Sequence, residues 1–447
     1  MDRRLSRTLV WVIAAAALRQ ALILQAIFRS RRLLSARLPE ENQNSLAGTD
    51  PVIYIIIPVL REAAIIRQTV EYFNMLIEGR NAQLVVVTTE REQAEREHHP
   101  SSGDTIQAVQ ELAGMGRCLY LHYPDPGGLK ADQINFVARH IASSIEGCRA
   151  TDSIFLLCYD ADSRPPVDSL AHFQRAIAQH PNVSVFHQSS RFELRHNPSH
   201  AGRGIASWLL RPVAEAGALR ANRFVLGFEL PRLINRSVLV GPWKRRLGSY
   251  VYAHVTGHGL CVQLSLLLRL PFPPQSPLED MHYSFILGSQ DIDMHPVLSL
   301  DSAEVSGSLR VQVEQAARWF SGPGRFRRYL RDPQTKPGLR AWLLATSAFA
   351  ICIEWLSCAI IPPLLLPLLL CAPRAVRVAT ASYLSVYLCG VVVTDMLLTS
   401  SSQPTQRLVR IFAYPASCML FGLGGMMGAI QLSRGASSAG KTERGNT

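Results

Sequence analysis

The C-terminal part of the chain limits the fold most, because three long apolar blocks follow Arg340. They cover roughly Ala341–Ala372, Ala375–Thr399 and Leu408–Leu432. Because about 20 apolar residues in a helix cross a bilayer core, each block is long enough to span a membrane. The first block exceeds one perpendicular span and contains an adjacent pair of prolines, so we expect a kinked helix or an interfacial helix that leads into a span.

A fourth apolar segment lies near the N-terminus. Thr8–Phe28 is about one bilayer long, and it is interrupted only by Arg19 and two glutamines. Arg31 and Arg32 follow it, where a cleaved signal peptide would have small residues. The sequence therefore favours an uncleaved membrane anchor over residues 1–38.

Charged residues are scarce in this chain, and the balance is basic. Hydrophobic residues make up 48% of it and charged residues 18%, below the roughly 25% of a typical soluble domain, and the net charge is +12. Arginines gather where the apolar segments meet the middle of the chain. They are Arg29, Arg31, Arg32 and Arg37 at one boundary and Arg325, Arg327, Arg328 and Arg331 at the other. Basic flanks favour the cytoplasmic face, so we expect a multi-pass protein of the cell membrane with a cytoplasmic middle domain and a basic interfacial segment at 326–340. No basic stretch interleaves aromatic residues, so nucleic acid is not an expected partner.

Residues 50–325 alternate between strand and helix patterns. Val52–Pro58 (VIYIIIP) is a continuous apolar run, typical of a strand buried on both faces. Ile66, Val70 and Phe73 then recur at helical spacing. Further strands are expected at Leu84–Thr88, Cys118–Tyr123 and Ile154–Tyr159. The alternation predicts an α/β fold with a mainly parallel sheet, in which ligands bind beyond the carboxyl ends of the strands.

Two carboxylates directly follow one of these strands. The run Asp152–Asp162 reads DSIFLLCYDAD, so Asp160 and Asp162 are spaced one residue apart and point to the same side of a turning backbone. Such a pair suits a hard divalent cation that also binds substrate phosphates, and the cation would neutralise a diphosphate leaving group. The alternative is a strand-end turn with solvated aspartates.

A second carboxylate pair follows a proline-rich stretch. The run LPFPPQSPLEDM predicts a loop that delivers Glu279 and Asp280. A hydroxyl group is a poor nucleophile near neutral pH and needs a positioned base. Asp280 would serve as this base, with Glu279 orienting the acceptor. The alternative is an acidic first turn of a helix, which the helix dipole favours.

A third motif lies on an expected helix. Gln315, Arg318 and Trp319 share one face at helical spacing. Arg318 could pair with a diphosphate, and Trp319 could stack against a sugar ring. The alternative is an amphipathic helix with a snorkelling arginine.

The ordered set DAD, then ED, then QxxRW resembles the family-2 glycosyltransferases of the GT-A fold. It is especially similar to the membrane synthases of cellulose, hyaluronan, chitin and poly-N-acetylglucosamine. The resemblance covers roughly Pro51 to Arg325. It implies a GT-A, Rossmann-like mixed sheet over residues 50–325, with transmembrane helices at both ends.

Other stretches also match this family. Ile57–Glu62 (IPVLRE) lies where these enzymes meet the nucleoside, and Gly128–Asn135 (GLKADQIN) resembles the stretch whose lysine reaches the donor. Gly257-His258-Gly259 lies where a glycine-rich turn borders the acceptor site, and glycine lets the backbone approach a sugar closely.

The resemblance implies a role for each matching residue. The implied donor-binding residues are Glu62, Lys130, Asp160, Asp162, Gln315 and Arg318. Asp160 and Asp162 would also hold Mg²⁺ or Mn²⁺. The implied acceptor-binding residues are Gly257, His258 and Trp319, and the implied catalytic residues are Asp280 as base and Glu279.

Two departures concern the nucleoside pocket. Where the family usually has Asp-Asp-x-Ser after its second strand, this chain reads Thr88–Arg91 (TTER), with Glu90 as the candidate substitute. Arg61 stands where the family usually has asparagine. The UDP-sugar donor that the resemblance implies is therefore its least supported part.

The sequence thus predicts a membrane-bound inverting glycosyltransferase that extends a polysaccharide from a nucleotide-sugar. The alternative is non-processive transfer to a lipid or lipid-linked acceptor at the membrane face. A non-catalytic membrane scaffold is disfavoured, because all three motifs are intact. Glu354 and Asp395 lie inside apolar blocks and are expected to face a cavity or a partner, or an interface if the spans are shifted. Residues 341–433 are expected to form the C-terminal transmembrane helices, and 434–447 a disordered tail.

Overall fold

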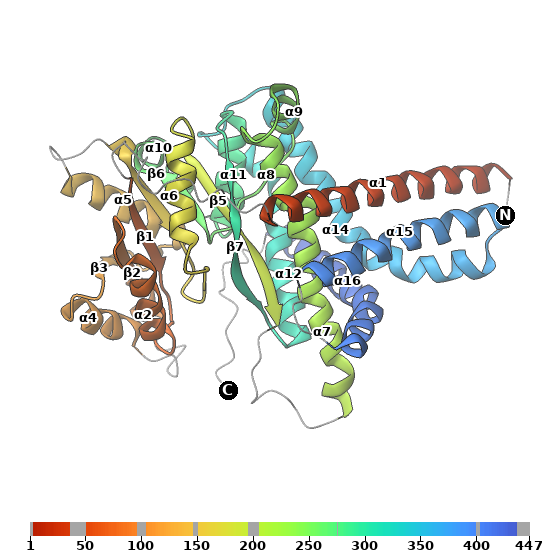
Figure 1. Ribbon diagram of the computed structural model, residues 1–447, viewed down its shortest axis with the longest axis horizontal. Helices are drawn as coiled ribbons and strands as arrows, with labels where there is room; N and C mark the ends of the chain where they lie inside the picture. Colours follow the sequence, from red (N-terminus) through yellow and green to blue (C-terminus); the bar gives the residue numbers. More distant parts are fainter. Residues whose placement is uncertain are drawn as a thin grey trace.

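A computed structural model describes most of the chain. The described residues are 3–35, 51–95, 104–145, 151–194, 205–274, 276–398 and 403–435. Nearly all of the tail expected at 434–447 therefore lies outside the described residues. A twisted sheet with its covering helices forms one end of the molecule, and long helices project from the other end together with the N-terminus (Figure 1).

The sheet has seven strands in the order β3-β2-β1-β4-β6-β5-β7. Their bounds are β1 Val52–Pro58, β2 Ala82–Thr89, β3 Leu119–Tyr123, β4 Ile154–Cys158, β5 Val185–Leu194, β6 Leu260–Gln263 and β7 His295–Val305. Strands β1 to β4 pair in parallel, as do β5 and β7, whereas β6 runs antiparallel to β4 and β5. The predicted α/β fold is confirmed, and the sheet is mixed because of β6.

Both faces of the sheet are covered by helices, as the continuous apolar strands predict. On β1, Ile56 faces one core and Ile55 and Ile57 face the other, because successive side chains of a strand alternate between faces. One core is closed by α5 Lys130–Ser144, α10 Leu264–Arg269 and α11 Glu279–Ser289. The other is closed by α2 Ile66–Ile77, α4 Thr105–Gly114 and α6 Ser169–Gln179. The short helix α3 Arg91–Ala94 follows β2.

Four helices among the described residues are long and apolar enough to cross a membrane. They are α1 Arg3–Ser35, α14 Leu339–Cys371, α15 Arg374–Leu398 and α16 Pro404–Ser433. The last three correspond to the three apolar blocks of the sequence. The first block forms the single helix α14, which contains Pro362 and Pro363.

The acidic residues inside these apolar helices have cationic partners. Glu354 of α14 lies 2.5 Å from an Nη of Arg19 on α1. Asp395 of α15 is buried and accepts a 2.8 Å hydrogen bond from Nε of Arg410 on α16, with Arg407 Nε also 2.8 Å away. The expectation that Glu354 and Asp395 face partners is confirmed. The pairing with Glu354 also explains why Arg19 lies within the apolar N-terminal helix.

A layer of helices lies between the sheet and the membrane-length helices (Figure 1). It comprises α7 Ile205–Phe224, a π-helical turn Val225–Glu229, α8 Leu230–Arg236, α9 Pro242–Gly248, α12 Leu309–Gly324 and α13 Phe326–Tyr329. Helix α12 packs closely on α16, where a Cβ added to Gly428 would lie 2.5 Å from the carbonyl oxygen of Ala317. This contact holds the predicted Gln315-Arg318-Trp319 helix against the membrane-length helices.

Candidate functional site

A cavity of about 2010 Å³ connects the sheet to the membrane-length helices. Its wall begins beyond the carboxyl ends of β1 and β4 and continues to Leu365 of α14 and Leu388 of α15. All eleven site residues named from the sequence line it. They are Glu62, Lys130, Asp160, Asp162, Gly257, His258, Glu279, Asp280, Gln315, Arg318 and Trp319. Residues spread over 258 positions of the chain therefore share one cavity, which the sheet topology brings about.

Lys130 is the centre of the ionic cluster. Its Nζ lies 2.6 Å from Oδ1 of Asp160 and 3.8 Å from Oε1 of Glu279, and it donates a 2.9 Å hydrogen bond to the carbonyl oxygen of Gly257. Burial alone would lower the pKa of Lys130, but the charges of Asp160 and Glu279 outweigh burial and raise the pKa. Lys130 therefore stays positively charged across the neutral range.

Asp160 and Asp162 lie on the turn that follows β4, as the sequence predicts. The amide of Ser163 donates to the carbonyl oxygen of Asp160 at 3.0 Å and closes the turn. The carbonyl oxygen of Ala161 accepts from Thr69 Oγ1 at 2.6 Å and from Arg164 at 3.2 Å. These bonds hold the backbone from outside, so that both carboxylates line the cavity.

Glu279 and Asp280 do not lie in the loop that the sequence predicts. They occupy the position given as the alternative, the acidic first turn of a helix. The loop ends before Glu279, and both residues form the acidic first turn of α11, where the helix dipole stabilises negative charge. The amide of Met281 donates to Asp280 Oδ1 at 2.7 Å. Burial raises the pKa of Glu279 to about 7, with the charge of Asp280 adding to the rise and that of Lys130 opposing it. Glu279 can therefore exchange a proton near neutral pH.

Gly257 lies against three charged groups at once. A Cβ added there would be 2.8 Å from Lys130 Nζ, 3.3 Å from Glu279 Oε1 and 3.4 Å from Asp280 Oδ2. The absence of a side chain thus allows the lysine and the two carboxylates to meet over this backbone. The glycine-rich turn that the sequence singles out borders the acidic pair.

His258 is held by two buried partners from the sheet. Its Nδ1 lies 2.9 Å from Ser190 Oγ and 3.3 Å from Oδ2 of Asp301, which is fully buried on β7. Burial alone would lower the pKa of His258, but the hydrogen bond and charge of Asp301 outweigh it and raise the pKa. Ser190 and Asp301 escape sequence reasoning, because no local pattern pairs a histidine with residues 68 and 43 positions away.

Glu62 follows a sharp turn at the end of β1. Arg61 has φ 56°, in the left-handed region, and its amide donates to Glu92 Oε2 at 2.8 Å. The other oxygen of Glu92 accepts from the amide of Thr105, and the Thr105 hydroxyl accepts from the amide of Glu62 at 2.9 Å. Such a backbone conformation costs on the order of 1–3 kcal/mol and persists only where the surroundings hold it. Here buried Glu92 and Thr105 hold the turn that directs Glu62 to the cavity.

Glu90, the candidate substitute in the nucleoside pocket, has a different role in the structure. Its Oε2 lies 3.0 Å from Nε2 of His122, whose Nδ1 is 2.8 Å from Thr88 Oγ1. Thr89 and Arg91 line the cavity at this point, whereas Glu90 is not part of the wall. In this structure Glu90 bonds to His122, and Arg91 is the charged group that this segment presents to the cavity.

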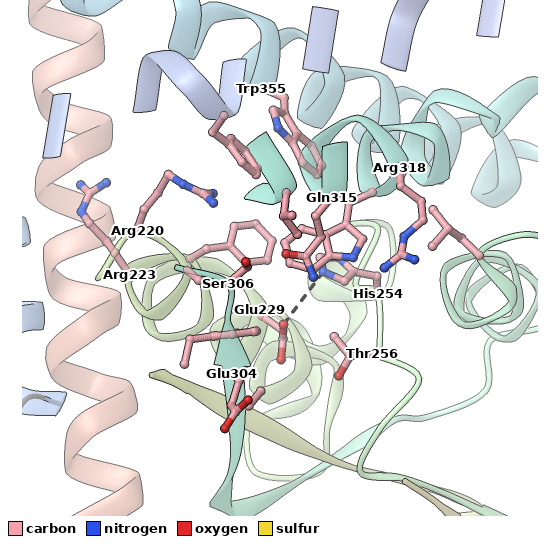
Figure 2. Close-up of a pocket in the computed structure, with 18 of the residues that line it drawn as sticks. Arg220, Arg223, Glu229, His254, Thr256, Glu304, Ser306, Gln315, Arg318 and Trp355 are labelled. Carbon is pink, nitrogen blue, oxygen red and sulfur yellow. Dashed lines mark ion pairs between the residues drawn. The ribbon is translucent and has the colours of Figure 1, made fainter. Parts of the chain in front are cut away.

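The predicted helix face is present on α12. Gln315, Arg318 and Trp319 all line the cavity, and Figure 2 shows Gln315 and Arg318 above His254 and Glu229. Burial lowers the pKa of Arg318, while the charges of Asp160, Glu279 and Asp280 oppose that shift. Arg318 therefore faces the same carboxylates as Lys130, and its Nε has no hydrogen-bond partner in the described part of the chain.

A buried polar group borders the cavity beside the π-helical turn. Glu229 Oε1 lies 3.6 Å from Nε2 of His187. Its Oε2 lies 4.0 Å from Nε2 of His254 (Figure 2). π-Helical turns are rare and often occur at functional sites. The sequence signal that could have found Glu229 is a single carboxylate within the apolar run VLGFELP.

A divalent cation such as Mg²⁺ requires oxygen ligands, which the carboxylates of the cavity can provide. Within the described ranges, no group of three or more His, Cys, Asp or Glu side chains could hold a metal ion. Asp160 and Asp162 provide oxygen ligands of the kind that Mg²⁺ prefers, and Mg²⁺ is often bound by one or two carboxylates together with substrate phosphates. This pair therefore fits a cation that binds together with a diphosphate.

Comparisons with known proteins give likeness at the level of structure only. No protein-family model and no curated protein matches the chain. It is similar to the mannosyltransferase PcManGT from Pyrobaculum calidifontis in complex with GDP-Man and Mn²⁺, at 17% identity and TM-score 0.44 over 88% of this chain and 99% of that one. It is also similar to glucosyl-3-phosphoglycerate synthase from Mycobacterium tuberculosis with Mg²⁺ and UDP, at 15% identity and TM-score 0.30 over 57% and 70%. A complex of that synthase with Mn²⁺, UDP and glucosyl-3-phosphoglycerate gives 14% identity and TM-score 0.33 over 63% and 81%.

Proposed function

We propose that this protein is a membrane-bound, inverting glycosyltransferase of the GT-A type that uses a nucleotide-sugar donor. One observation carries the proposal. Lys130 lies between Asp160 and Glu279 and against Gly257, within a cavity at the carboxyl ends of the strands. This constellation combines a cation for a leaving diphosphate with carboxylates for an attacking hydroxyl.

The donor binds at the sheet end of the cavity. Asp160 and Asp162 hold Mg²⁺ or Mn²⁺, which when bound neutralises charge on the diphosphate. Lys130 and Arg318 face the same region, because the negative charge of Asp160 acts to raise the pKa of both. Both cations stabilise the leaving group. Glu62 lies toward the nucleoside. A UDP-sugar is the donor that the sequence resemblance implies, and the similar solved structures include one with GDP-Man and others with UDP.

The acceptor hydroxyl reacts at the first turn of α11. Asp280 accepts the hydroxyl proton, and Glu279 orients the hydroxyl. The acceptor oxygen bonds to the anomeric carbon while the bond from that carbon to the diphosphate breaks on the opposite face. A single displacement of this kind inverts the anomeric centre and gives a β-linkage from an α-linked donor. Gly257 leaves room for the acceptor beside both carboxylates.

The shape of the cavity favours a lipid acceptor at the membrane face. Its wall continues between α14 and α15, two of the four helices long and apolar enough to cross a membrane. A growing polysaccharide is the second candidate, because Trp319 of α12 lines the same cavity and aromatic rings stack on sugars. The basic flanks support a multi-pass protein of the cell membrane with the catalytic domain, residues 50–325, facing the cytoplasm. Residues 1–38 and 341–433 are the membrane parts in this proposal, and the basic segment 326–340 joins the second of them to the catalytic domain.

The test uses the full chain in detergent or nanodiscs with Mg²⁺ or Mn²⁺ and a panel of GDP-sugars and UDP-sugars. We expect nucleotide release that Asp280→Asn reduces at least 100-fold, since one positioned base contributes about 10²–10⁴-fold. Asp291→Asn is the matched control, because Asp291 is exposed, pairs with Arg340 and lies outside the cavity wall. A single-sugar lipid adduct supports the lipid acceptor, and a ladder of chains supports the polysaccharide. No release with any donor, or full activity in Asp280→Asn, would contradict the proposed reaction.

A further inference from the structure

The wall of the cavity on the membrane side is mainly basic, since Arg19, Arg220, Arg223 and Arg232 line it with one carboxylate, Glu354, which pairs with Arg19. Arg220 and Arg223, one helical turn apart on α7, line this part, and Figure 2 shows both on the wall next to α1. The guanidinium carbon of Arg220 lies 3.4 Å from the centre of the Phe421 ring, and that of Arg223 lies 4.7 Å from the centre of the Tyr387 ring. Two guanidinium groups thus lie among aromatic rings of the membrane-length helices.

Neither arginine has a carboxylate partner among the described residues. Arg223 donates a 2.6 Å hydrogen bond to the neutral amide oxygen of Gln20, and the buried Nε atoms of both arginines lack any hydrogen-bond partner there. Burial lowers the pKa of Arg220, and the groups that act most strongly against this shift are tyrosines and cysteines. Burial would also lower the pKa of Arg223, but Tyr414 and Tyr387 outweigh it and raise that pKa, and Tyr414 is also a hydrogen-bond partner of Arg223. Other arginines of the same region are paired, Arg19 with Glu354 and Arg410 with Asp395.

The lack of a carboxylate partner for Arg220 and Arg223 among the described residues is unusual, because buried charges in proteins are normally paired. Arg220 and Arg223 are both at an open cavity, so a ligand can supply the anion. A guanidinium group matches the planar, two-pronged geometry of phosphate and carboxylate oxygens. The position therefore suits the charged group of a ligand rather than an internal ion pair.

The cavity beside these arginines is apolar. Its wall includes leucines of α14 and α15: Leu365, Leu366, Leu369, Leu384 and Leu388. Leu366 is 61% exposed and Leu388 is 39% exposed, so both present apolar surface that no part of the described chain covers fully. A charged pair of arginines next to an apolar channel in membrane-length helices is complementary to a molecule with an anionic head and a hydrocarbon tail.

We infer that the acceptor is a phosphate-bearing membrane lipid, whose phosphate binds Arg220 and Arg223 and whose hydrocarbon chain lies between α14 and α15. This inference rests on the proposed function and specifies its acceptor. A hydroxyl of the lipid head reaches Asp280 through the same cavity. Its oxygen forms the bond to the anomeric carbon, its proton passes to Asp280, and the nucleoside diphosphate leaves with the electrons of the broken bond.

The binding experiment uses the full chain in a maltoside detergent, which contains no phosphate, and three probes. Phosphatidylglycerol carries a phosphate and free hydroxyls, diacylglycerol is an uncharged lipid, and inorganic phosphate has no hydrocarbon chain. Native mass spectrometry counts retained lipid, and the thermal midpoint reports stabilisation. We expect phosphatidylglycerol to bind at least tenfold more tightly than diacylglycerol and to raise the thermal midpoint, with no effect of inorganic phosphate at equal concentration. Equal binding of diacylglycerol, or equal stabilisation by inorganic phosphate, would overturn the lipid assignment.

Variants locate the site. Arg220→Gln and Arg223→Gln should each weaken phosphatidylglycerol binding about tenfold, whereas Arg67→Gln, which removes a surface ion pair with Glu111, should leave binding unchanged. Arg220→Lys keeps the charge and should bind with intermediate affinity, which separates loss of the anion site from misfolding. Unchanged lipid binding in both glutamine variants refutes this site.

The two proposals fail separately. Donor-dependent nucleotide release by the unmodified protein tests the transferase alone. Selective phosphatidylglycerol binding without nucleotide release would refute the transferase and retain the lipid site, whereas nucleotide release without selective lipid binding would refute only the lipid acceptor.

Discussion

The Nζ of Lys130 lies 2.6 Å from Oδ1 of Asp160. This contact joins the first residue of α5 to the turn after β4. The same Nζ bonds to the carbonyl oxygen of Gly257, so three separate segments meet at one cation. This arrangement orders the sheet end of the cavity, where we propose that the donor binds. Pre-formed electrostatics of this kind stabilise a transition state without reorganisation during the reaction.

Replacing Lys130 should therefore damage catalysis more than folding. Lys130→Met removes the cation that faces the leaving diphosphate, and we expect kcat/KM for nucleotide release to fall at least 100-fold, a loss of about 2.7 kcal/mol of transition-state stabilisation. Lys130→Arg keeps the charge and should retain more activity than Lys130→Met. Equal activity of Lys130→Met and the unmodified enzyme would exclude a role in donor activation.

A substitution of Gly257 tests whether the close approach of Lys130, Glu279 and Asp280 to this backbone matters for activity. In Gly257→Ala the new Cβ would lie 2.8 Å from Lys130 Nζ, so the lysine must move away from Asp160. We expect kcat to fall at least tenfold with little change in the thermal midpoint. Gly241→Ala is the matched control, since its φ is −60° and a Cβ there meets nothing within 4 Å. Similar losses in both variants would mean that the effect is not specific to the site.

The pKa of Glu279 predicts a pH dependence. Burial raises this pKa from 4.5 to about 7. Since the ionised carboxylate of Glu279 accepts a stronger hydrogen bond from the acceptor hydroxyl than the protonated acid does, kcat should rise with pH through about 7 and then level off. The effect on stability has the opposite sign. The folded state binds this proton more tightly, so the contribution of Glu279 to the free energy of unfolding is full below pH 4.5 and declines as the pH rises through about 7.

The check is a pH–rate profile of the unmodified enzyme and of Glu279→Gln. The variant should lack the rise near pH 7, because its side chain does not titrate. An unchanged rise in Glu279→Gln would assign the titration to another group.

Metal dependence follows from the carboxylate pair after β4. Removal of divalent cations with EDTA should abolish nucleotide release, and Mg²⁺ or Mn²⁺ should restore it. Asp162→Asn should raise the cation concentration needed for half-maximal activity, because one anionic ligand is lost. Binding of Mn²⁺ in the presence of a nucleoside diphosphate, followed by electron paramagnetic resonance, gives a readout that does not depend on turnover. Full activity in EDTA would contradict this prediction.

The buried pair of Asp395 and Arg410 should stabilise the membrane-length helices. Asp395→Asn removes the buried anion that pairs with both Arg407 and Arg410, and leaves Arg410 with a longer 4.0 Å contact to Glu215. Breaking a buried ion pair in this way costs about 3–5 kcal/mol. We expect a clearly lower thermal midpoint in detergent. Asp293→Asn breaks the more exposed pair with Arg245 and should cost no more than about 1 kcal/mol. Equal midpoints of the two variants would show that the Asp395 pair contributes little.

Local sequence patterns predicted several of the elements and singled out residues that the structure places around one cavity. The run Val52–Pro58 predicts β1 with its observed bounds, and the apolar blocks correspond to α14, α15 and α16. These predictions succeed because strand and helix periodicities are local, and because a membrane-length apolar run has few alternative structures. The spacing of Asp160 and Asp162 likewise indicates a paired carboxylate without knowledge of the fold.

The tertiary structure alone decided which charges meet. Glu279 opens α11 instead of lying in a loop, and Glu90 bonds to His122 instead of lining the cavity. Arg220 and Arg223 lie in a segment whose pattern indicates no function, and their significance depends on Phe421 and other residues far along the chain.

Lys130 and Asp160 show the same division between sequence and structure. The motif order indicates that both residues belong to one site, but their contact and the close approach of Gly257 depend on how β4, α5 and the glycine turn pack. The physical reason is that a hydrophobic pattern records whether a residue is buried, whereas an ion pair depends on the distance between atoms that only the folded chain brings together.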